Sequence, residues 1–154
     1  MRKLSIIMLG VLLLTKVTAQ TTNKMLETNK AFTGATATKA DYHAIYQLDN
    51  NDPKIIEKAI RNINNVLNDP RLVGKVQIEL IAFSGGTDAY MKGSKYEEGI
   101  KALAEKGVIV AQCNNTLVER KISRDQIYDF IAVVPSANGE LIIRAAEGWT
   151  IIKP

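Results

Sequence analysis

The sequence has few of the residues that build cross-linked or metal-bound scaffolds, since its 154 residues include one cysteine and one histidine. A single cysteine excludes a disulfide within the chain. A zinc site would need carboxylates beside that cysteine and histidine, and no ligand spacing predicts one. With 46% hydrophobic and 23% charged residues and only four prolines, the chain is neither collagen-like nor disordered. A chain of about 150 residues suits one domain with a substantial core.

The N-terminal segment has the three-part pattern of a secretory signal peptide. Arg2 and Lys3 precede an apolar run over residues 4–14, and small residues lead to Ala19. Spanning a membrane takes about 20 apolar residues, so an uncleaved anchor is the less favoured alternative. We therefore expect a cleaved signal peptide, a periplasmic mature protein that begins at Gln20, and no stable membrane anchor.

The charge of the chain points at first to an anionic partner, because 20 basic and 16 acidic residues give a net charge of +4. Three of the basic residues and none of the acidic ones lie within residues 1–19, so the mature chain carries a net charge of +1. The other cations are scattered among acids and are not interleaved with aromatic side chains. No nucleic-acid partner is therefore expected.

Two segments follow the signal peptide. Residues 20–40 are rich in Thr, Asn, Ala and Lys and show neither strict alternation nor a sustained helical pattern. This composition predicts a flexible tether. Regular patterning begins at Tyr42, so we expect the folded domain to occupy residues 41–154.

The domain shows strands and helices in alternation. Asp52 and Pro53 form a strong helix start, and the apolar face of that helix extends to Leu67. Ser123 and Gln126 have the spacing of a capping box for a short helix. Strands are expected over residues 42–48, 75–82, 108–112, 130–134 and 149–152, with further helices over residues 95–106 and from Pro135 to Gly148. The alternation predicts a three-layer, doubly wound α/β fold with a mainly parallel five-stranded sheet and helices on both faces.

Cys113 is the most informative candidate residue, because it directly follows the strand over residues 108–112. In open α/β sheets, functional groups gather in the loops beyond the carboxyl ends of the strands. A helix beginning near Asn114 or Asn115 would direct free amides at the sulfur and favour the thiolate. The residues alone leave three alternatives open: an inert core thiol, a pairing across subunits, or a thiol used in chemistry.

Cations near Cys113 in the sequence could add positive potential at the thiol. They are Arg120, Lys121 and Arg124. Positive charge beside a cysteine favours its thiolate.

A second candidate is the loop Ser84-Gly85-Gly86-Thr87, which follows the strand over residues 75–82. Its backbone amides could bind an anion. It lacks the spacing of a phosphate-binding or dinucleotide-binding loop, so a tight strand exit is the favoured interpretation.

The remaining polar candidates favour structural roles. His43 lies within the first expected strand rather than at its carboxyl end. Asp49 and Asp52 are typical of turn and cap residues. No nucleophile and base are paired in the sequence, so a hydrolase or phosphate-transfer enzyme has no support.

Several segments of the domain resemble the DsrE/DsrF-like family, which includes sulfur-relay proteins of the TusD type. The resemblance covers roughly residues 42–154, and its most specific elements are the strand that ends in Cys-Asn-Asn-Thr and the late Glu-Gly-Trp. The segments that carry it are His43–Leu48, Asn51–Pro53, Asn62–Leu67, Gly107–Val108, Ala111–Thr116, Val133–Ser136 and Ala146–Pro154.

The resemblance implies a function, because relay members carry sulfur as a persulfide on a cysteine at the position of Cys113. It implies a sulfur carrier or sulfurtransferase-type protein that holds sulfane sulfur on this thiol and passes it to a partner thiol. Asn114, Asn115 and Thr116, with the loop of Ser84, Gly85 and Gly86, would shape the binding pocket. The alternative is a non-catalytic binding or assembly module of the same fold, with Cys113 in the core.

The resemblance also implies partners. A thiol protein or a small sulfane-sulfur compound would donate or accept the sulfur, and the chain would form a homo-oligomer, a trimer or a hexamer. No cofactor and no metal are expected.

Overall fold

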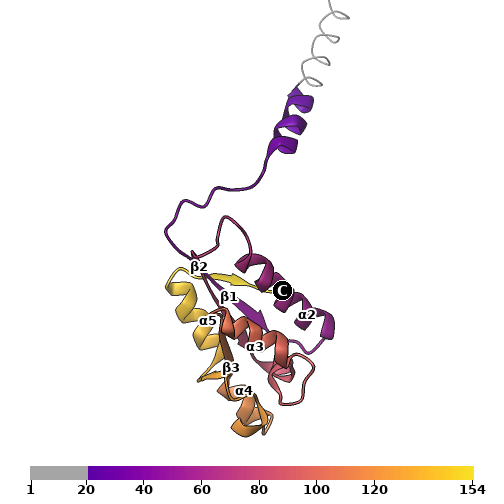
Figure 1. The fold of residues 1–154 in the computed structure, drawn as a ribbon. Helices are drawn as coiled ribbons and strands as arrows, with labels where there is room; N and C mark the ends of the chain where they lie inside the picture. The colour runs from indigo at the N-terminus through magenta and orange to yellow at the C-terminus, as the bar shows by residue number, and fades with distance from the viewer. Residues whose placement is uncertain (1–20) are drawn as a thin grey trace, which may run out of the picture. The chain divides into compact units, whose positions relative to one another are not determined.

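The computed structural model describes residues 21–154 (Figure 1). The expected signal peptide and its cleavage after Ala19 lie outside the described residues. The chain divides into two compact units, Met1–Thr36 and Ala37–Pro154. Among residues 21–154, no helix is both long and apolar enough to cross a membrane.

The described part of the first unit contains a helix where the sequence pattern predicted none, because residues 21–31 are helical. This stretch has no glycine or proline before Gly34 and includes good helix formers such as Lys24, Met25 and Leu26. Its large apolar side chains Met25 and Leu26 are exposed.

The second unit is an α/β domain with short elements in alternation. Its strands are β1 (Tyr42–Leu48), β2 (Val76–Ala82), β3 (Ile109–Cys113), β4 (Ala132–Val134) and β5 (Thr150–Ile152). Its helices are α2 (Pro53–Leu67), α3 (Glu97–Glu105), α4 (Asn114–Glu119) and α5 (Ala137–Ala146), with 3₁₀ helices η1 (Ser84–Tyr90) and η2 (Arg124–Gln126).

All five strands are parallel and lie in the order β4-β3-β2-β1-β5. The predicted fold class is confirmed, and the sheet is wholly parallel where the sequence predicted a mainly parallel one. β1 pairs with β2 along its full length, from Tyr42 opposite Val76 to Leu48 opposite Ala82. The strand predicted over residues 130–134 is shorter than expected and begins at Ala132.

Helix boundaries follow the capping signals of the sequence. Asp52 caps α2 by accepting a hydrogen bond from the amide of Lys54, and Pro53 is its first residue. The hydroxyl of Ser136 caps α5 by accepting from the amide of Gly139. The predicted capping box of Ser123 is present, although the element it opens is the 3₁₀ helix η2.

Each face of the sheet has its own apolar core, and different helices cover the two faces. One core contains buried side chains of α2 and α3 and Leu117 of α4. The other contains Ala137 and Leu141 of α5, with Trp149 and Cys113. In Figure 1, α5 and α2 accordingly lie on opposite sides of β1. The domain therefore has three layers, and α5 is the helix that covers the second face within the described chain.

Candidate functional site

The site lies where two neighbouring strands send the chain to opposite faces of the sheet. β3 continues into α4, whose Leu117 packs in the core with α2 and α3, whereas β4 leads to α5 on the other face. Such a switch in direction opens a crevice at the carboxyl ends of the two strands, which is where open α/β sheets bind their ligands. Cys113 and Val134 are paired at this edge.

Cys113 is the last residue of β3 and the N-cap residue of α4. Its side chain faces α5, and only 5% of the residue is exposed. The sulfur is not in a wholly apolar site, because its Sγ accepts a hydrogen bond from the amide of Ala137 over 3.3 Å. Ala137 is the first residue of α5, so this amide has no partner within its own helix.

Two opposing effects act on the pKa of the Cys113 thiol. Burial raises the pKa, whereas hydrogen bonds from the backbone amides of Ala137, Thr116 and Asn115 and from the Thr116 side chain lower it. The hydrogen bonds prevail and hold the pKa below its usual value. The geometry therefore favours the thiolate, which is the nucleophilic form of cysteine.

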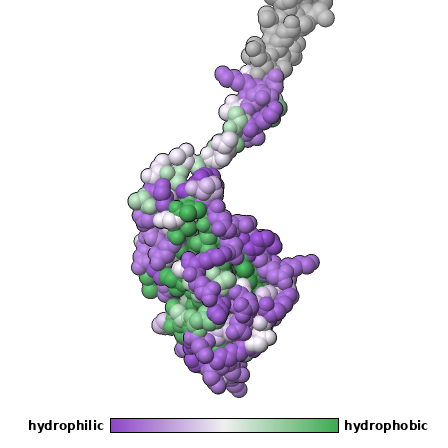
Figure 2. All heavy atoms as spheres, in the orientation of Figure 1, coloured by the Kyte–Doolittle hydropathy of each residue, from purple (hydrophilic) through white to green (hydrophobic). Residues whose placement is uncertain are grey.

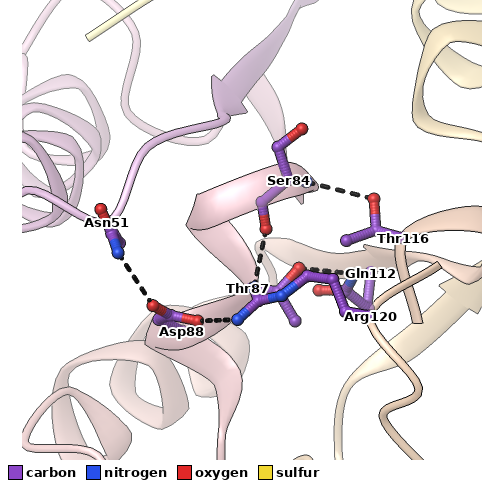
Figure 3. Close-up of polar contacts among 7 residues, drawn as sticks. All are labelled: Asn51, Ser84, Thr87, Asp88, Gln112, Thr116 and Arg120. Atoms are coloured by element: carbon purple, nitrogen blue, oxygen red, sulfur yellow. Dashed lines mark hydrogen bonds and ion pairs between the residues drawn. The ribbon is translucent and has the colours of Figure 1, made fainter.

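Thr116 connects the Cys113 turn to the loop that follows β2. Its Oγ1 accepts a hydrogen bond from the amide of Ser84 over 3.1 Å (Figure 3). Ser84 has a φ of 47°, in the left-handed region that side chains other than glycine rarely adopt. The structure thus brings Cys113, Thr116 and Ser84 together at one edge of the sheet.

A charged pair that the sequence pattern did not predict lies beside this loop. The Arg120 guanidinium donates to the carbonyl of Ser84 over 2.9 Å and to Oδ1 of Asp88 over 2.6 Å. Oδ2 of Asp88 accepts from the side-chain amide of Asn51 (Figure 3). Burial raises the pKa of Asp88, but the bonds from Arg120 and Asn51 outweigh it and lower the pKa. Side chains from three strand exits therefore share one hydrogen-bonded network.

This network changes the expected role of the nearby cations. Arg120 is paired with Asp88 rather than left as free positive charge. Arg124 donates to the backbone carbonyls of Tyr128, Asp129 and Ile131. The hydrogen bonds that favour the Cys113 thiolate thus come mainly from backbone amides.

The two loop glycines allow a close approach to the end of β1. A Cβ on Gly86 would lie 1.8 Å from the carbonyl oxygen of Leu48, and one on Gly85 would lie 3.1 Å from the amide of Asn51. The Gly86 amide donates to the carbonyl of Phe83 and so is not free for an anion. Close packing between the loop after β2 and the end of β1 therefore explains why both positions are glycine.

Gln112 supports the cysteine from the other face of the sheet. It is fully buried, and its side-chain amide donates to Oγ1 of Thr87 over 3.0 Å and to the carbonyl of Cys113 over 2.9 Å. The sequence offered a weak signal for this role, namely a polar residue within an otherwise apolar strand.

Asn114 and Asn115 are exposed at the start of α4. Asn114 also lines a groove of about 510 Å³ with Val118, Lys121 and Val133. Val133 and Val134 point to opposite faces of the sheet, so the groove lies on the face of Leu117, away from the Cys113 side chain.

The other polar candidates lie apart from Cys113. His43 is near the amino end of β1, where its ring centroid is 5.0 Å from that of Trp149. Asp49 forms an ion pair with Lys153 over 2.7 Å. Within residues 21–154, no three His, Cys, Asp or Glu side chains are grouped to hold a metal ion.

Fold and site together define a parallel α/β domain with a thiol at its topological switch point. The chain matches the model of the DsrE/DsrF-like family over residues 55–154, and it belongs to this family. The search of curated proteins found no match.

Similar solved structures include three from archaea and bacteria. The protein of unknown function MTH1491 from Methanobacterium thermoautotrophicum is 30% identical with a TM-score of 0.70, and the match covers 74% of this chain and 100% of that one. The ychN protein of E. coli is 17% identical with a TM-score of 0.54, over 73% of this chain and 99% of that one. The protein of unknown function BT1422 from Bacteroides thetaiotaomicron is 12% identical with a TM-score of 0.55, over 79% of this chain and 100% of that one. The last two show the shared fold alone.

Replacing Thr116 with valine tests the hydrogen bonds at the thiol. We expect the midpoint for alkylation of wild-type Cys113 by iodoacetamide to lie below that of an unperturbed thiol. Thr116→Val removes a hydroxyl that favours the thiolate, so the midpoint should rise and the rate at pH 7 should fall roughly threefold. Thr150→Val, at an exposed position of β5, is the matched control and should leave the profile unchanged. Equal profiles for wild type and Thr116→Val would contradict the assignment.

Proposed function

We propose that the protein is a sulfur carrier that holds sulfane sulfur as a persulfide on Cys113. The observation that carries this proposal is the hydrogen bond from the Ala137 amide to Sγ, which favours the thiolate together with the bonds from Asn115 and Thr116. Membership of a family that includes sulfur-relay proteins supports the same assignment.

The chemistry consists of two exchange steps. The Cys113 thiolate attacks the outer sulfur of a donor persulfide, a new S–S bond forms, and the donor thiolate leaves with the electron pair of the broken S–S bond. An acceptor thiolate then attacks the outer sulfur carried by Cys113. The S–S bond to Cys113 breaks, and Cys113 leaves as a thiolate. A lowered thiol pKa favours the second step, because a more acidic thiol is the better leaving group. No net oxidation occurs in either step.

The residues around Cys113 form the surface that a sulfur donor or acceptor would contact. Asn114 and Asn115 are exposed beside the nearly buried sulfur, so we assign them to contact with the donor or acceptor. Ser84 and Thr116 hold the turn on the other side of the crevice. Gly85 and Gly86 act indirectly, by letting the Ser84 loop pack against β1.

The burial of Cys113 favours a second candidate, a binding or assembly module in which this thiol is part of the core. The two candidates differ in the effect of Cys113→Ser. A sulfur carrier loses its function with this variant, whereas an assembly module keeps it and depends on its oligomeric state.

Sulfur loading is tested directly by intact-mass spectrometry. We expect the purified protein, incubated with polysulfide or thiosulfate, to gain the mass of one sulfur atom that a reductant removes. Cys113→Ser should gain none, since Cys113 is the one thiol of the sequence. A Cys113 that stays unmodified and also resists alkylation in the folded protein would rule the proposal out.

We also infer that the chain is exported, from the signal-peptide pattern of residues 1–19. Protein recovered from the periplasm of an expressing bacterium should have the mass of a chain that begins at Gln20. Ala19→Arg should block cleavage, because the peptidase reads a small residue there, whereas Thr22→Val should be processed normally. A full-length mass in the soluble periplasmic fraction would contradict this inference.

Exposed apolar side chains on α5 support a homo-oligomer, which we propose to be a trimer or a hexamer. Ile142 is 70% and Ile143 is 55% exposed, and Figure 2 shows apolar surface where α5 lies. Ile142→Asp should lower the mass measured by light scattering during gel filtration, because a buried carboxylate would oppose association. Val73→Asp, at an exposed valine outside the strands and helices, is the control. A monomeric wild-type protein would contradict the proposal.

A further inference from the structure

α5 contacts the sheet through one stripe of side chains. Ala137, Leu141 and Arg144 are spaced four and three residues apart, which places them on one face of the helix. Ala137 and Leu141 are buried in the core on this side of the sheet. Arg144 is the third member of the stripe and its one charged residue.

The partner of Arg144 in the sheet is a buried carboxylate. Glu79 lies in β2, is 1% exposed, and accepts a hydrogen bond through Oε2 from Nε of Arg144 over 2.8 Å. The guanidinium also lies 4.1 Å from the ring centroid of Trp149. Glu140 and Glu147 pair with Arg144 as well, but they belong to α5 or directly follow it. Of these three carboxylates, Glu79 alone ties the helix to the sheet.

A buried ion pair such as this one is weak evidence for a stabilising role. Oε1 of Glu79 is buried and has no hydrogen-bond partner. Burial raises the pKa of Glu79, and the Arg144 pairing offsets this only in part. Buried ion pairs often stabilise a fold no better than apolar side chains of similar volume, and their best-attested use is to specify one geometry.

The geometry that this pair specifies includes the thiol site. Arg144 lies about two helical turns, roughly 10 Å, from Ala137 along the same face of α5. Rotating or tilting α5 would move both residues together. Because the Ala137 amide reaches Sγ over 3.3 Å and is the first-residue amide of α5, a small displacement of the helix would break this hydrogen bond.

We propose that Glu79 is a positioning residue for Cys113: by holding Arg144 it sets the rotation of α5 and so directs the Ala137 amide at the sulfur. The proposal rests on the proposed sulfur-carrier function, because the Cys113 thiolate that Glu79 would position is the group that carries the sulfur. It assigns a role in this chemistry to a side chain that does not contact Cys113.

The test is the pH profile of Cys113 alkylation by iodoacetamide in Glu79→Gln. Loss of the positioning pair should raise the midpoint and slow alkylation at pH 7 by about three- to tenfold. Removing a negative charge has the opposite electrostatic effect and by itself would lower the midpoint. The sign of the change therefore separates positioning from a long-range charge effect.

Glu140→Gln is the matched control, because it also removes a carboxylate from Arg144 but leaves the link to the sheet intact. Its profile should match the wild type. A folded Glu79→Gln protein with an unchanged or lowered midpoint would overturn the proposal, as would an equal rise in Glu140→Gln.

Circular dichroism establishes that each variant is folded. If Glu79→Gln does not fold, the double variant Glu79→Leu with Arg144→Met replaces the pair by apolar contacts and should still raise the midpoint. An unchanged profile in that variant overturns the proposal. Alkylation needs no sulfur donor, so a wild-type protein that takes up no sulfur contradicts the proposed function and leaves the effect of Glu79 measurable.

Discussion

The hydrogen bond from the Ala137 amide to Cys113 Sγ is the contact on which the candidate site depends, and the order of the strands makes it possible. β3 and β4 are neighbours, but the chain leaves them toward opposite faces of the sheet. The start of α5 therefore lies over the end of β3, and a first-turn amide without a helical partner faces the sulfur. A thiol in an apolar core would otherwise have a raised pKa.

The site stabilises negative charge with backbone groups more than with free cations. Arg120 is paired with Asp88, and Arg124 donates to three backbone carbonyl oxygens. A thiolate held by amides depends on the exact placement of helices, because an amide cannot move independently of its helix as a lysine side chain can. The residues that hold the surrounding helices and loops in place therefore affect the thiol indirectly. They include Thr116, Gln112 and Glu79.

Much of the fold was predictable from local patterns. The bounds of β1 and α2 follow from an apolar strand, a turn and the Asp52-Pro53 cap, all of which act over a few residues. The strand predicted over residues 108–112 is found one residue later, at Ile109–Cys113, so Cys113 is its last residue rather than the residue after it. The helix over residues 21–31 was not predicted, because its sequence lacks the apolar stripe that marks helices packed in a core.

The sequence by itself determined the class of fold, the position of the one thiol at the end of a strand, and the resemblance to the DsrE/DsrF-like family, which the family match over residues 55–154 confirms. These properties depend on periodicity, capping and residue identity, which are local. Only the tertiary structure decided that the Ala137 amide faces the sulfur, that Asp88 pairs with Arg120, and that Glu79 holds Arg144. Each of these contacts joins residues 24 to 65 positions apart. Such contacts are set by strand order and helix packing, which no single stretch of sequence encodes.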